Sequence, residues 1–219
     1  MFTKSTLIVA VIAMTASMSK ADIVINEIMK NPETPIRDVD GEWFELFNSG
    51  NTAVNLDGWT IRDDGSDSHV INNGGNLIIG AGEYLVLGNN DDFAVNGNLQ
   101  FDYEYSDFAL SNGGDEIVLL DLSATEVDRV NYNNAEFPNF DGESLSLISP
   151  FLDNNIGANW EDAKIDPSTF ETLFDRQYFE NNFGTPGAIN FSSVPEPSSI
   201  AVLGFFAIGL LSRRRQVSC

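Results

Sequence analysis

The sequence predicts an all-β domain, a β-sandwich, lying between two terminal segments that each contain an apolar run. Short apolar runs rich in Ile, Val, Leu, Phe and Tyr recur along the chain, and turn-forming Gly, Asn and Asp separate them. No stretch before Asp166 has a helical period. Short strands at close spacing with no helices between them favour a sandwich over a parallel α/β sheet.

The chain opens with the layout of a secretory signal peptide. Lys4 gives a positive n-region, residues 6–14 form an apolar h-region, and residues 19–21 form a small-x-small cleavage site. We expect residues 1–21 to be removed by signal peptidase, between Ala21 and Asp22. The alternative interpretation of this segment is a buried N-terminal helix.

Seven apolar runs are expected to form strands. Several alternate between two faces, as Phe44 and Leu46 do against Trp43, Glu45 and Phe47. The runs are residues 22–29, 42–48, 58–64, 76–88, 115–122, 125–132 and 143–149.

Turns between these runs carry the residues that tight turns need. Leu56 and Trp59 flank Asp57 and Gly58, which suits a turn that delivers an aromatic ring to the core. Gly82 stands before a central strand in the same way. The sequence GTPG at 184–187 would close the domain, because proline cannot continue a central strand.

Ordered blocks of sequence resemble the lamin tail domain, in its bacterial exported form. They are IVINEIMKNP, GEWFELFNSGNTAVNLDGWTIRDD, IGAGEYLVLGNN, FALSNGGDEIVLLDLSATEVDRVNY, DGESLSL and GTPGAIN, which span about residues 22–190. The pair WFELFN and LDGW is the most specific. The resemblance implies an immunoglobulin-like β-sandwich.

Residues 159–183 depart from the family pattern, because they separate the last strand block from GTPG by more than is usual. Phe170, Leu173, Phe174 and Tyr178 have the spacing of one helix face, so a short amphipathic helix is one interpretation. A long surface loop is the other.

The C-terminal part of the chain resembles the PEP-CTERM sorting signal. A polar linker at 191–197 ends in the PEP motif, and residues 198–219 hold twelve apolar residues at 200–211 followed by a basic cluster. The motif residues are Pro195, Glu196 and Pro197, and the cluster is Arg213, Arg214 and Arg215.

The resemblance implies recognition in the inner membrane by an exosortase-type protease and removal of the tail near the PEP motif. The chain would then reach the cell surface or extracellular matrix of a Gram-negative-type bacterium. Twelve apolar residues form a short hydrophobic helix, below the roughly 20 residues of a stable span, which fits transient membrane association. A permanent C-terminal anchor is the alternative.

Charge excludes a further class of partner. Residues 22–198 hold all 33 Asp and Glu residues but only six Lys and Arg residues, which gives a net charge of −27. Such a chain repels nucleic acid and anionic lipid, so we expect no nucleic-acid binding.

The residues needed for catalysis are scarce, and we expect no enzyme activity. His69 is the one histidine, expected in a loop or strand start with a solvated or capping role and without an evident serine partner. The one cysteine, Cys219, is the last residue, and no serine lies in a G-x-S-x-G elbow. Acidic pairs are so numerous that they arise by chance.

Calcium is the one cofactor that the turns suit. Three turns gather carboxylate ligands, although none fits an EF-hand: with Gly41 at the loop glycine, Ile36 and Phe47 take positions that need carboxylates. Roles in turn formation and solubility are the alternative. The residues are Asp38, Asp40 and Glu42, then Asp63, Asp64 and Asp67, then Asp91 and Asp92.

Two classes of function remain. The first is a non-catalytic exported module that mediates adhesion to exopolysaccharide or to matrix proteins, with the aromatic residues of FDYEYSDF as a stacking face or as core. The alternative is a calcium-dependent extracellular hydrolase acting on polysaccharide, which needs a carboxylate pair placed by the fold.

Overall fold

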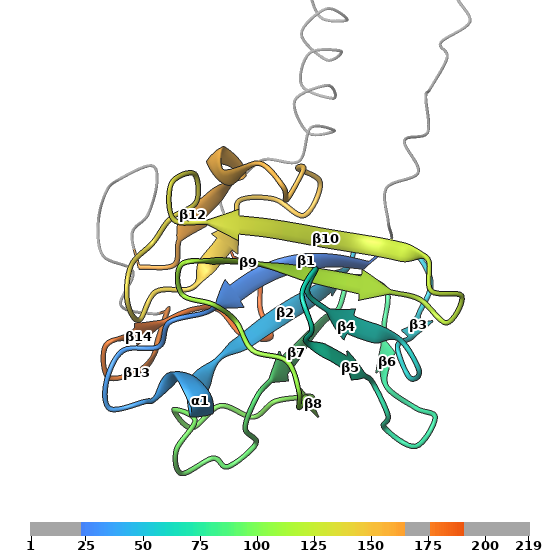
Figure 1. The fold of residues 1–219 in the computed structure, drawn as a ribbon, viewed down its shortest axis with the longest axis horizontal. Helices are drawn as coiled ribbons and strands as arrows, with labels where there is room; N and C mark the ends of the chain where they lie inside the picture. Colours follow the sequence, from blue (N-terminus) through green and yellow to red (C-terminus); the bar gives the residue numbers. More distant parts are fainter. Residues whose placement is uncertain (1–22, 165–175, 191–219) are drawn as a thin grey trace, which may run out of the picture.

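The computed structural model describes residues 23–164 and 176–190 (Figure 1). The predicted cleavage site at Ala21 and Asp22, the PEP motif at 195–197 and the arginines at 213–215 all lie outside the described residues. So does the whole of the short apolar helix expected near the C-terminus.

The described part is nearly all β, as predicted, with one α-helical turn and one 3-10 turn. The elements are β1 (Ile23–Met29), α1 (Asp38–Gly41), β2 (Trp43–Asn48), β3 (Val54–Asn55), β4 (Thr60–Arg62), β5 (Ser68–Val70), β6 (Ile78–Ile79), β7 (Tyr84–Gly88), β8 (Tyr103–Glu104), β9 (Gly114–Leu120), β10 (Glu126–Asn133), β11 (Leu145–Leu147), η1 (Gly157–Asn159), β12 (Trp160–Asp162), β13 (Gln177–Phe179) and β14 (Asn182–Phe183).

Two sheets stack face to face (Figure 1). The larger has the order β12-β11-β1-β2-β7-β8, and all its pairs are antiparallel except β7 with β8. The smaller has the order β10-β9-β4-β5. Two further pairs, β3 with β6 and β13 with β14, form short two-stranded sheets. The predicted immunoglobulin-like β-sandwich is confirmed as the fold class.

The core lies between the two sheets. Ile25, Phe44 and Leu46 from the larger sheet pack in one cluster with Ile117 and Val130 from the smaller one. The alternation expected in residues 43–47 is present, because Phe44 and Leu46 face this core. Burial of these side chains is the main source of stability, at roughly 25 cal/mol per Å² of apolar surface.

The other face of the larger sheet is also covered. We call it the outer face, and it carries Glu27, Met29, Trp43, Glu45 and Val86. All five are buried. Alternation alone predicts that such a face contacts solvent, so the presence of a large ring like that of Trp43 on it requires a third layer.

That third layer is the closing segment, which we define as residues 176–190. The ring of Tyr178 in this segment packs edge-on against Trp43, with 6.2 Å between the ring centroids. Leu99 and Phe101, from the connection before β8, complete the apolar cluster over Met29, Trp43 and Val86.

A β-bulge interrupts β1 where it crosses the centre of the sheet. Ile25 lies opposite Leu46, but Glu27, not Asn26, lies opposite Glu45. The extra residue frees backbone groups from the ladder. The N–H of Ile25 donates to Asp128 Oδ2 in β10 at 2.7 Å, which ties the two sheets together.

The predicted turn chemistry is present. Gly58 has a φ of +85° and Gly82 a φ of +73°, in the left-handed region that favours glycine. Leu56 and Trp59, on either side of the first turn, are both buried in the core.

The predicted strands correspond to β1, β2, β4, β9, β10 and β11, with ends that differ by at most two residues, and to β6 and β7. The run expected at 76–88 is therefore two strands, because Gly80 to Glu83 form a turn closed by the N–H of Glu83 and the carbonyl of Gly80.

The structure describes only the two ends of residues 159–183, and both ends contain strands: β12 at the first, β13 and β14 at the second. Tyr178 lies in β13, so it does not belong to the expected helix. Phe170, Leu173 and Phe174 lie outside the described residues.

Gly142 tests how tightly the closing segment packs. Its φ is +74°, and a Cβ there would lie 2.4 Å from the backbone oxygen of Asn181. We expect Gly142→Ala to lower the free energy of unfolding by about 1–2 kcal/mol for the left-handed backbone. The overlap should add about 1–3 kcal/mol to that loss.

Gly74→Ala is the matched control, because Gly74 has a φ of +71° with nothing within 4 Å of an added Cβ. Urea denaturation of both variants measures the difference. Equal losses would show that the contact between Gly142 and Asn181 is loose.

Candidate functional site

The first acidic turn lies at the end of the sandwich, on and beside α1. Asp40 Oδ1 accepts a hydrogen bond from Asn90 Nδ2 at 2.9 Å, and its Oδ2 pairs with Arg37. Glu42 Oε2 accepts from the N–H of Leu110 at 3.0 Å. Asp38 Oδ2 accepts from Asn112 Nδ2 at 2.9 Å. Each carboxylate therefore has a protein donor.

Glu42 is the unusual member of this group. Burial is the main reason that its pKa is raised to about 7, and repulsion from Asp38 and Asp115 adds to it. Hydrogen bonds from Leu110 and Asn89 act in the opposite direction. A carboxyl group that binds a proton near neutral pH is suited to proton transfer, provided that a substrate reaches it.

Two surface depressions flank α1, and we call this region the α1 end. One has a volume of about 530 Å³ and is lined by residues including Asn31, Glu33 and Val39. The other, of about 180 Å³, is lined by residues including Val95 and Phe179. Apolar side chains are exposed in the same region, namely Val39, Phe93 and Val95.

The third acidic turn adjoins the first through Asn90. Its residues act mainly as turn formers: Asp92 Oδ1 accepts from the N–H of Ala94 at 3.0 Å, and the N–H of Asp91 donates to Glu104 Oε1 at 3.1 Å. The structure thus brings Asp40 near the 89–92 turn, where the Asp92 carboxylate is bonded to the backbone of its own turn.

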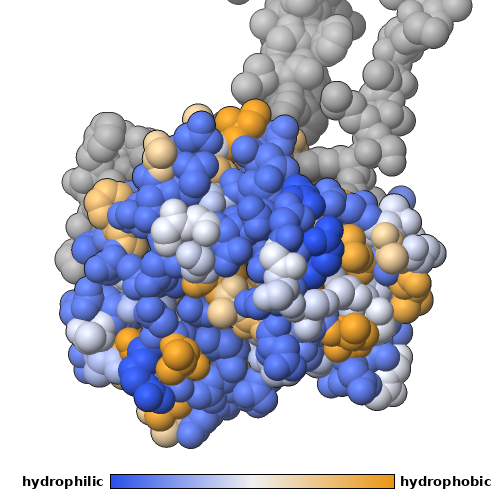
Figure 2. All heavy atoms as spheres, viewed as in Figure 1, coloured by the Kyte–Doolittle hydropathy of each residue, from blue (hydrophilic) through white to orange (hydrophobic). Residues whose placement is uncertain are grey.

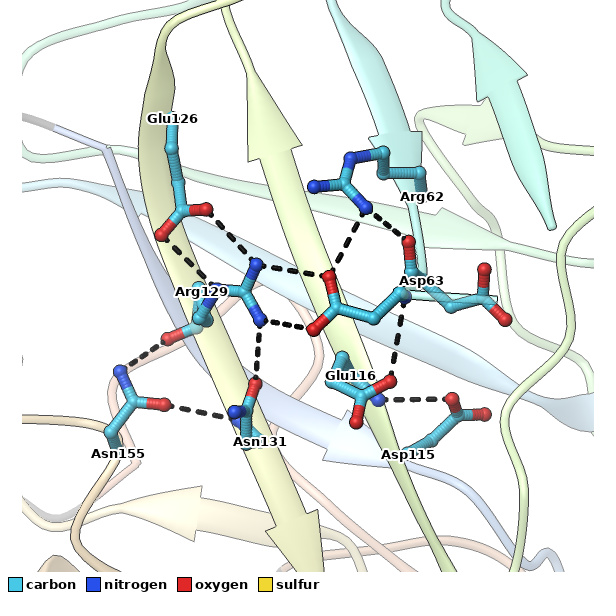
Figure 3. Close-up of polar contacts among 9 residues, drawn as sticks. Arg62, Asp63, Asp115, Glu116, Glu126, Arg129, Asn131 and Asn155 are labelled. Atoms are coloured by element: carbon cyan, nitrogen blue, oxygen red, sulfur yellow. Dashed lines mark hydrogen bonds and ion pairs between the residues drawn. The ribbon is translucent and has the colours of Figure 1, made fainter. Parts of the chain in front are cut away.

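The second acidic turn lies elsewhere, on the outward surface of the smaller sheet (Figure 3). Arg129 holds both oxygens of Asp64, at 2.8 and 3.1 Å, and also contacts Glu126 at 3.1 Å. Hydrogen bonds from Arg129 are the main cause that lowers the pKa of Asp64. Asp63 Oδ1 accepts from the N–H of Asp67 at 2.9 Å, which closes the turn.

Calcium binding stays a prediction. Among residues 23–164 and 176–190, no three or more His, Cys, Asp or Glu side chains are grouped so that they could hold a metal ion. The three turns do not meet at one point. The first and third turns lie together at the α1 end, whereas the second lies on the smaller sheet, where Arg129 pairs with Asp64.

His69 has a serine neighbour that the sequence did not indicate. It lies in β5, its Nε2 is 2.7 Å from Tyr103 Oη, and its Nδ1 accepts from the N–H of Ser106 at 3.2 Å. The Ser106 hydroxyl is 3.5 Å from Nδ1 and donates to Asp107 at 3.2 Å. The imidazole therefore joins β5 to the segment after β8.

Burial assigns most of the aromatic residues of FDYEYSDF to the interior. Phe101, Tyr105 and Phe108 are buried, and the last two pack against Phe44. Tyr103 is half-buried against His69. The stretch is core, and the interpretation as a stacking face is wrong for these buried rings.

Lys30 is a buried cation at the end of β1. Its ammonium group donates to the carbonyl of Asn112 at 2.7 Å and to the side-chain oxygens of Asn134 and Asn139 at 2.8 Å each. Burial lowers its pKa, and Asp141 opposes that shift. The three bonds fix the end of β1 to the turns on either side of the β9–β10 hairpin.

One of the two edges of the smaller sheet is capped by a side chain (Figure 3). β10 is the edge strand, and Asn155 places its amide against it. Asn155 Nδ2 donates to the carbonyl of Arg129 at 2.9 Å, and its Oδ1 accepts from the N–H of Asn131 at 3.0 Å. The amide thus takes the position that a peptide group of a further strand would take.

The most deeply buried acidic pair lies on the outer face. Glu27 and Glu45 are cross-strand partners, and neither has exposed surface. Glu27 accepts hydrogen bonds from Ser144, Ser146 and Thr185, and Glu45 accepts from Asn26 and Gly187. Their donors from the closing segment belong to the GTPG sequence.

Sequence reasoning missed this pair, although a signal was present. Glu27 is the one charged residue in β1, and Glu45 is the one charged residue in β2. A charge inside a strand that is otherwise apolar or neutral indicates either a solvent-facing edge or a buried polar contact. The choice between the two depends on the closing segment, more than 130 residues away from either glutamate.

Comparison with known proteins supplies a family. A sequence model of the Lamin Tail Domain matches residues 16–134, which is more than half of the 219-residue chain. The chain belongs to the lamin tail domain family. No curated protein matches it.

A solved structure with some similarity is that of a DUF4876 family protein from Bacteroides thetaiotaomicron VPI-5482. The identity is 11%, the alignment covers 82% of this chain and 75% of that chain, and the TM-score is 0.44.

The lamin tail domain match ends one residue after β10, but the sheets continue beyond it. β11 pairs with β1, and β12 pairs with β11. Asn190 donates to the carbonyls of Asn26 and Leu147 at 2.9 and 3.1 Å. The later blocks DGESLSL and GTPGAIN therefore contribute to the same fold as the matched part.

Across the described ranges no helix has the length and apolar character that a membrane crossing requires.

Asn155→Ala tests the cap on β10. We expect a loss of about 1 kcal/mol of unfolding free energy from the two hydrogen bonds, and self-association through the opened edge. Size-exclusion chromatography with light scattering measures the second effect. Asn72→Ala, at an exposed loop asparagine, is the control, and an Asn155→Ala variant as monomeric as that control would contradict the role of the cap.

Proposed function

We propose that this lamin tail domain protein is a non-catalytic exported module of the bacterial cell surface or extracellular matrix. Signal peptidase removes residues 1–21, and an exosortase-type protease processes the tail after a transient stay in the inner membrane. The module then binds exopolysaccharide or a matrix protein.

The observation that carries this proposal is the order of parts at the C-terminus. Asn190 is anchored in the sheet by its side chain, and the PEP motif begins at Pro195, followed by the apolar stretch and Arg213 to Arg215. The processing motif thus directly follows a folded domain. This arrangement suits a signal that acts after folding and is then discarded.

The α1 end is the part of the surface that suits a partner. Figure 2 shows a mostly hydrophilic face on which hydrophobic residues are scattered. At the α1 end, the exposed Phe93 lies in the turn that holds Asp91 and Asp92, and Asn90 connects that turn to Asp40. An aromatic ring beside carboxylate and amide oxygens is a common arrangement for binding sugar hydroxyls.

One observation favours the alternative of a calcium-dependent hydrolase acting on polysaccharide. Glu42, with its pKa raised to about 7, is beside Asp38 at the same end of the domain. Such a pair has the composition of a general acid and a ligand carboxylate. Against it, the Glu42 side chain is buried, and the hydrogen bonds from Leu110 and Asn89 occupy one of its oxygens.

Mass spectrometry of the exported protein tests the proposed processing. We expect the mature chain to begin at Asp22 and to end near the PEP motif. Replacing Arg213, Arg214 and Arg215 with alanine should leave the tail in place, because the arginines hold the C-terminus in the cytoplasm. An intact N-terminus would refute the signal peptide, and normal processing of the arginine variant would refute the sorting tail.

Calorimetric unfolding of the processed chain, in calcium and in chelator, separates the two functions. The non-catalytic module is expected to unfold at the same temperature in both. An ion that binds only the folded state stabilises it by about 2.7 kcal/mol at one hundred times its dissociation constant. A calcium-dependent rise in Tm that Glu42→Gln removes would therefore favour the hydrolase.

A further inference from the structure

The closing segment is held by a chain of hydrogen bonds whose donors can be assigned one by one. Asn190 Nδ2 donates to two backbone carbonyls, those of Asn26 and Leu147. This orientation of the amide is fixed, because a carbonyl can only accept. The other atom of the amide, Asn190 Oδ1, therefore accepts a hydrogen bond, and it faces the hydroxyl of Thr185.

The next link is the Thr185 hydroxyl. Its Oγ1 lies 3.0 Å from Asn190 Oδ1 and 2.9 Å from Glu27 Oε2. A hydroxyl has a single proton to donate. With that proton directed at Asn190, the contact with Glu27 needs a proton from the carboxyl side. A hydrogen on Glu27 Oε2 lets the Thr185 hydroxyl satisfy both neighbours. With an ionised Glu27, Thr185 donates to Glu27 instead, and Asn190 Oδ1 keeps only its contact with Asn26 Nδ2 at 3.2 Å.

The remaining contacts agree with that assignment. Glu27 Oε1 accepts from Ser144 Oγ at 2.5 Å, Ser146 Oγ at 3.1 Å and the N–H of Thr185 at 2.9 Å, so this oxygen is the carbonyl-like one. Glu45 differs, because both its oxygens face N–H donors: Asn26 Nδ2 at 2.8 Å and the N–H of Gly187 at 2.5 Å. Its surroundings suit the ionised form.

The electrostatics support a shared proton. Burial raises the pKa of Glu27, and burial followed by repulsion between the two carboxyl groups raises that of Glu45 to about 9. Because the two groups interact, this value describes the loss of the proton that the pair shares, whichever oxygen carries it. All the donors named above are neutral groups. The other titratable groups that act on the pair are Asp102, Tyr84 and Tyr178, and Arg176 begins the closing segment.

We propose that the proton on Glu27 is a latch that holds the closing segment over the outer face of the larger sheet. Loss of the proton leaves two carboxylates side by side. It also turns the Thr185 hydroxyl toward Glu27 and away from Asn190. The segment then lifts, and Met29, Trp43 and Val86 become accessible while the sandwich core stays closed.

The direction of the pH dependence follows from the folded and unfolded states. In the unfolded chain both glutamates lose their protons near pH 4.5, which is the ordinary pKa of a glutamate side chain. In the folded chain the pair keeps a proton up to about pH 9. The stabilisation is thus complete below pH 4.5 and is lost as the pH rises toward 9.

Two substitutions locate the proton. Glu27→Gln reproduces the protonated side chain, with an oxygen for Ser144, Ser146 and Thr185 N–H and an NH₂ for Thr185 Oγ1. We expect it to keep the Tm at pH 7 and to remove the alkaline loss of stability. Glu45→Gln places an NH₂ against N–H donors, and we expect it to lower the Tm by about 4 °C or more. Equal losses in both variants would overturn the assignment.

Thiol labelling distinguishes lifting of the segment from global unfolding. In the full chain with Cys219→Ser, Val86→Cys places a thiol under the closing segment, and Val130→Cys places one in the sandwich core. Both valines are buried. Between pH 7 and 9 we expect the ratio of the two labelling rates to rise about tenfold per pH unit, because opening releases one proton. Adding Glu27→Gln should abolish the rise.

A constant ratio would overturn the latch, because it would mean that the two layers open together or not at all. The ratio corrects for ionisation of the thiol, which both sites share. The experiment involves neither the sorting tail nor a partner, so its outcome does not depend on the proposed function.

Discussion

Burial of the larger sheet on both faces is the constraint on which the rest of the structure depends. The pattern of β2, with Phe44 and Leu46 on one side and Trp43 on the other, is stable only if something covers the second side. The closing segment supplies that cover. It is held by carboxyl and amide side chains as well as by apolar contacts, so polar groups inside the molecule decide where it lies.

The bulge at Asn26 makes this arrangement compatible with the sandwich. Without the extra residue, Glu27 would lie one position out of register with Glu45, and its side chain would turn toward the core. With it, Ile25 points inward and Glu27 outward, and the freed N–H of Ile25 is used to bind Asp128 in the other sheet. A single inserted residue thus links all three layers.

The sequence predicted what depends on local pattern. The sandwich, most long strands and the turn at Gly58 follow from alternation and turn chemistry, which act over a few residues. Short strands such as β8 and β13 were not predicted, because their pairing depends on distant partners. The serine beside His69 was not predicted for the same reason, since 37 residues separate it from the imidazole. The sequence also indicated the acidic turns. Whether they bind calcium depends on whether the fold brings several carboxylates to one point, and the spacing of residues along the chain does not determine that.

The composition explains why a proton holds the closing segment. Six cations serve 33 acidic residues between positions 22 and 198, and several of those cations already have surface or loop partners, such as Asp64 for Arg129 and the 112–139 turns for Lys30. With no cysteine in that range either, a disulfide is excluded. A buried carboxyl in such a chain is most readily neutralised by a proton, and a proton-dependent contact responds to the pH of the surroundings.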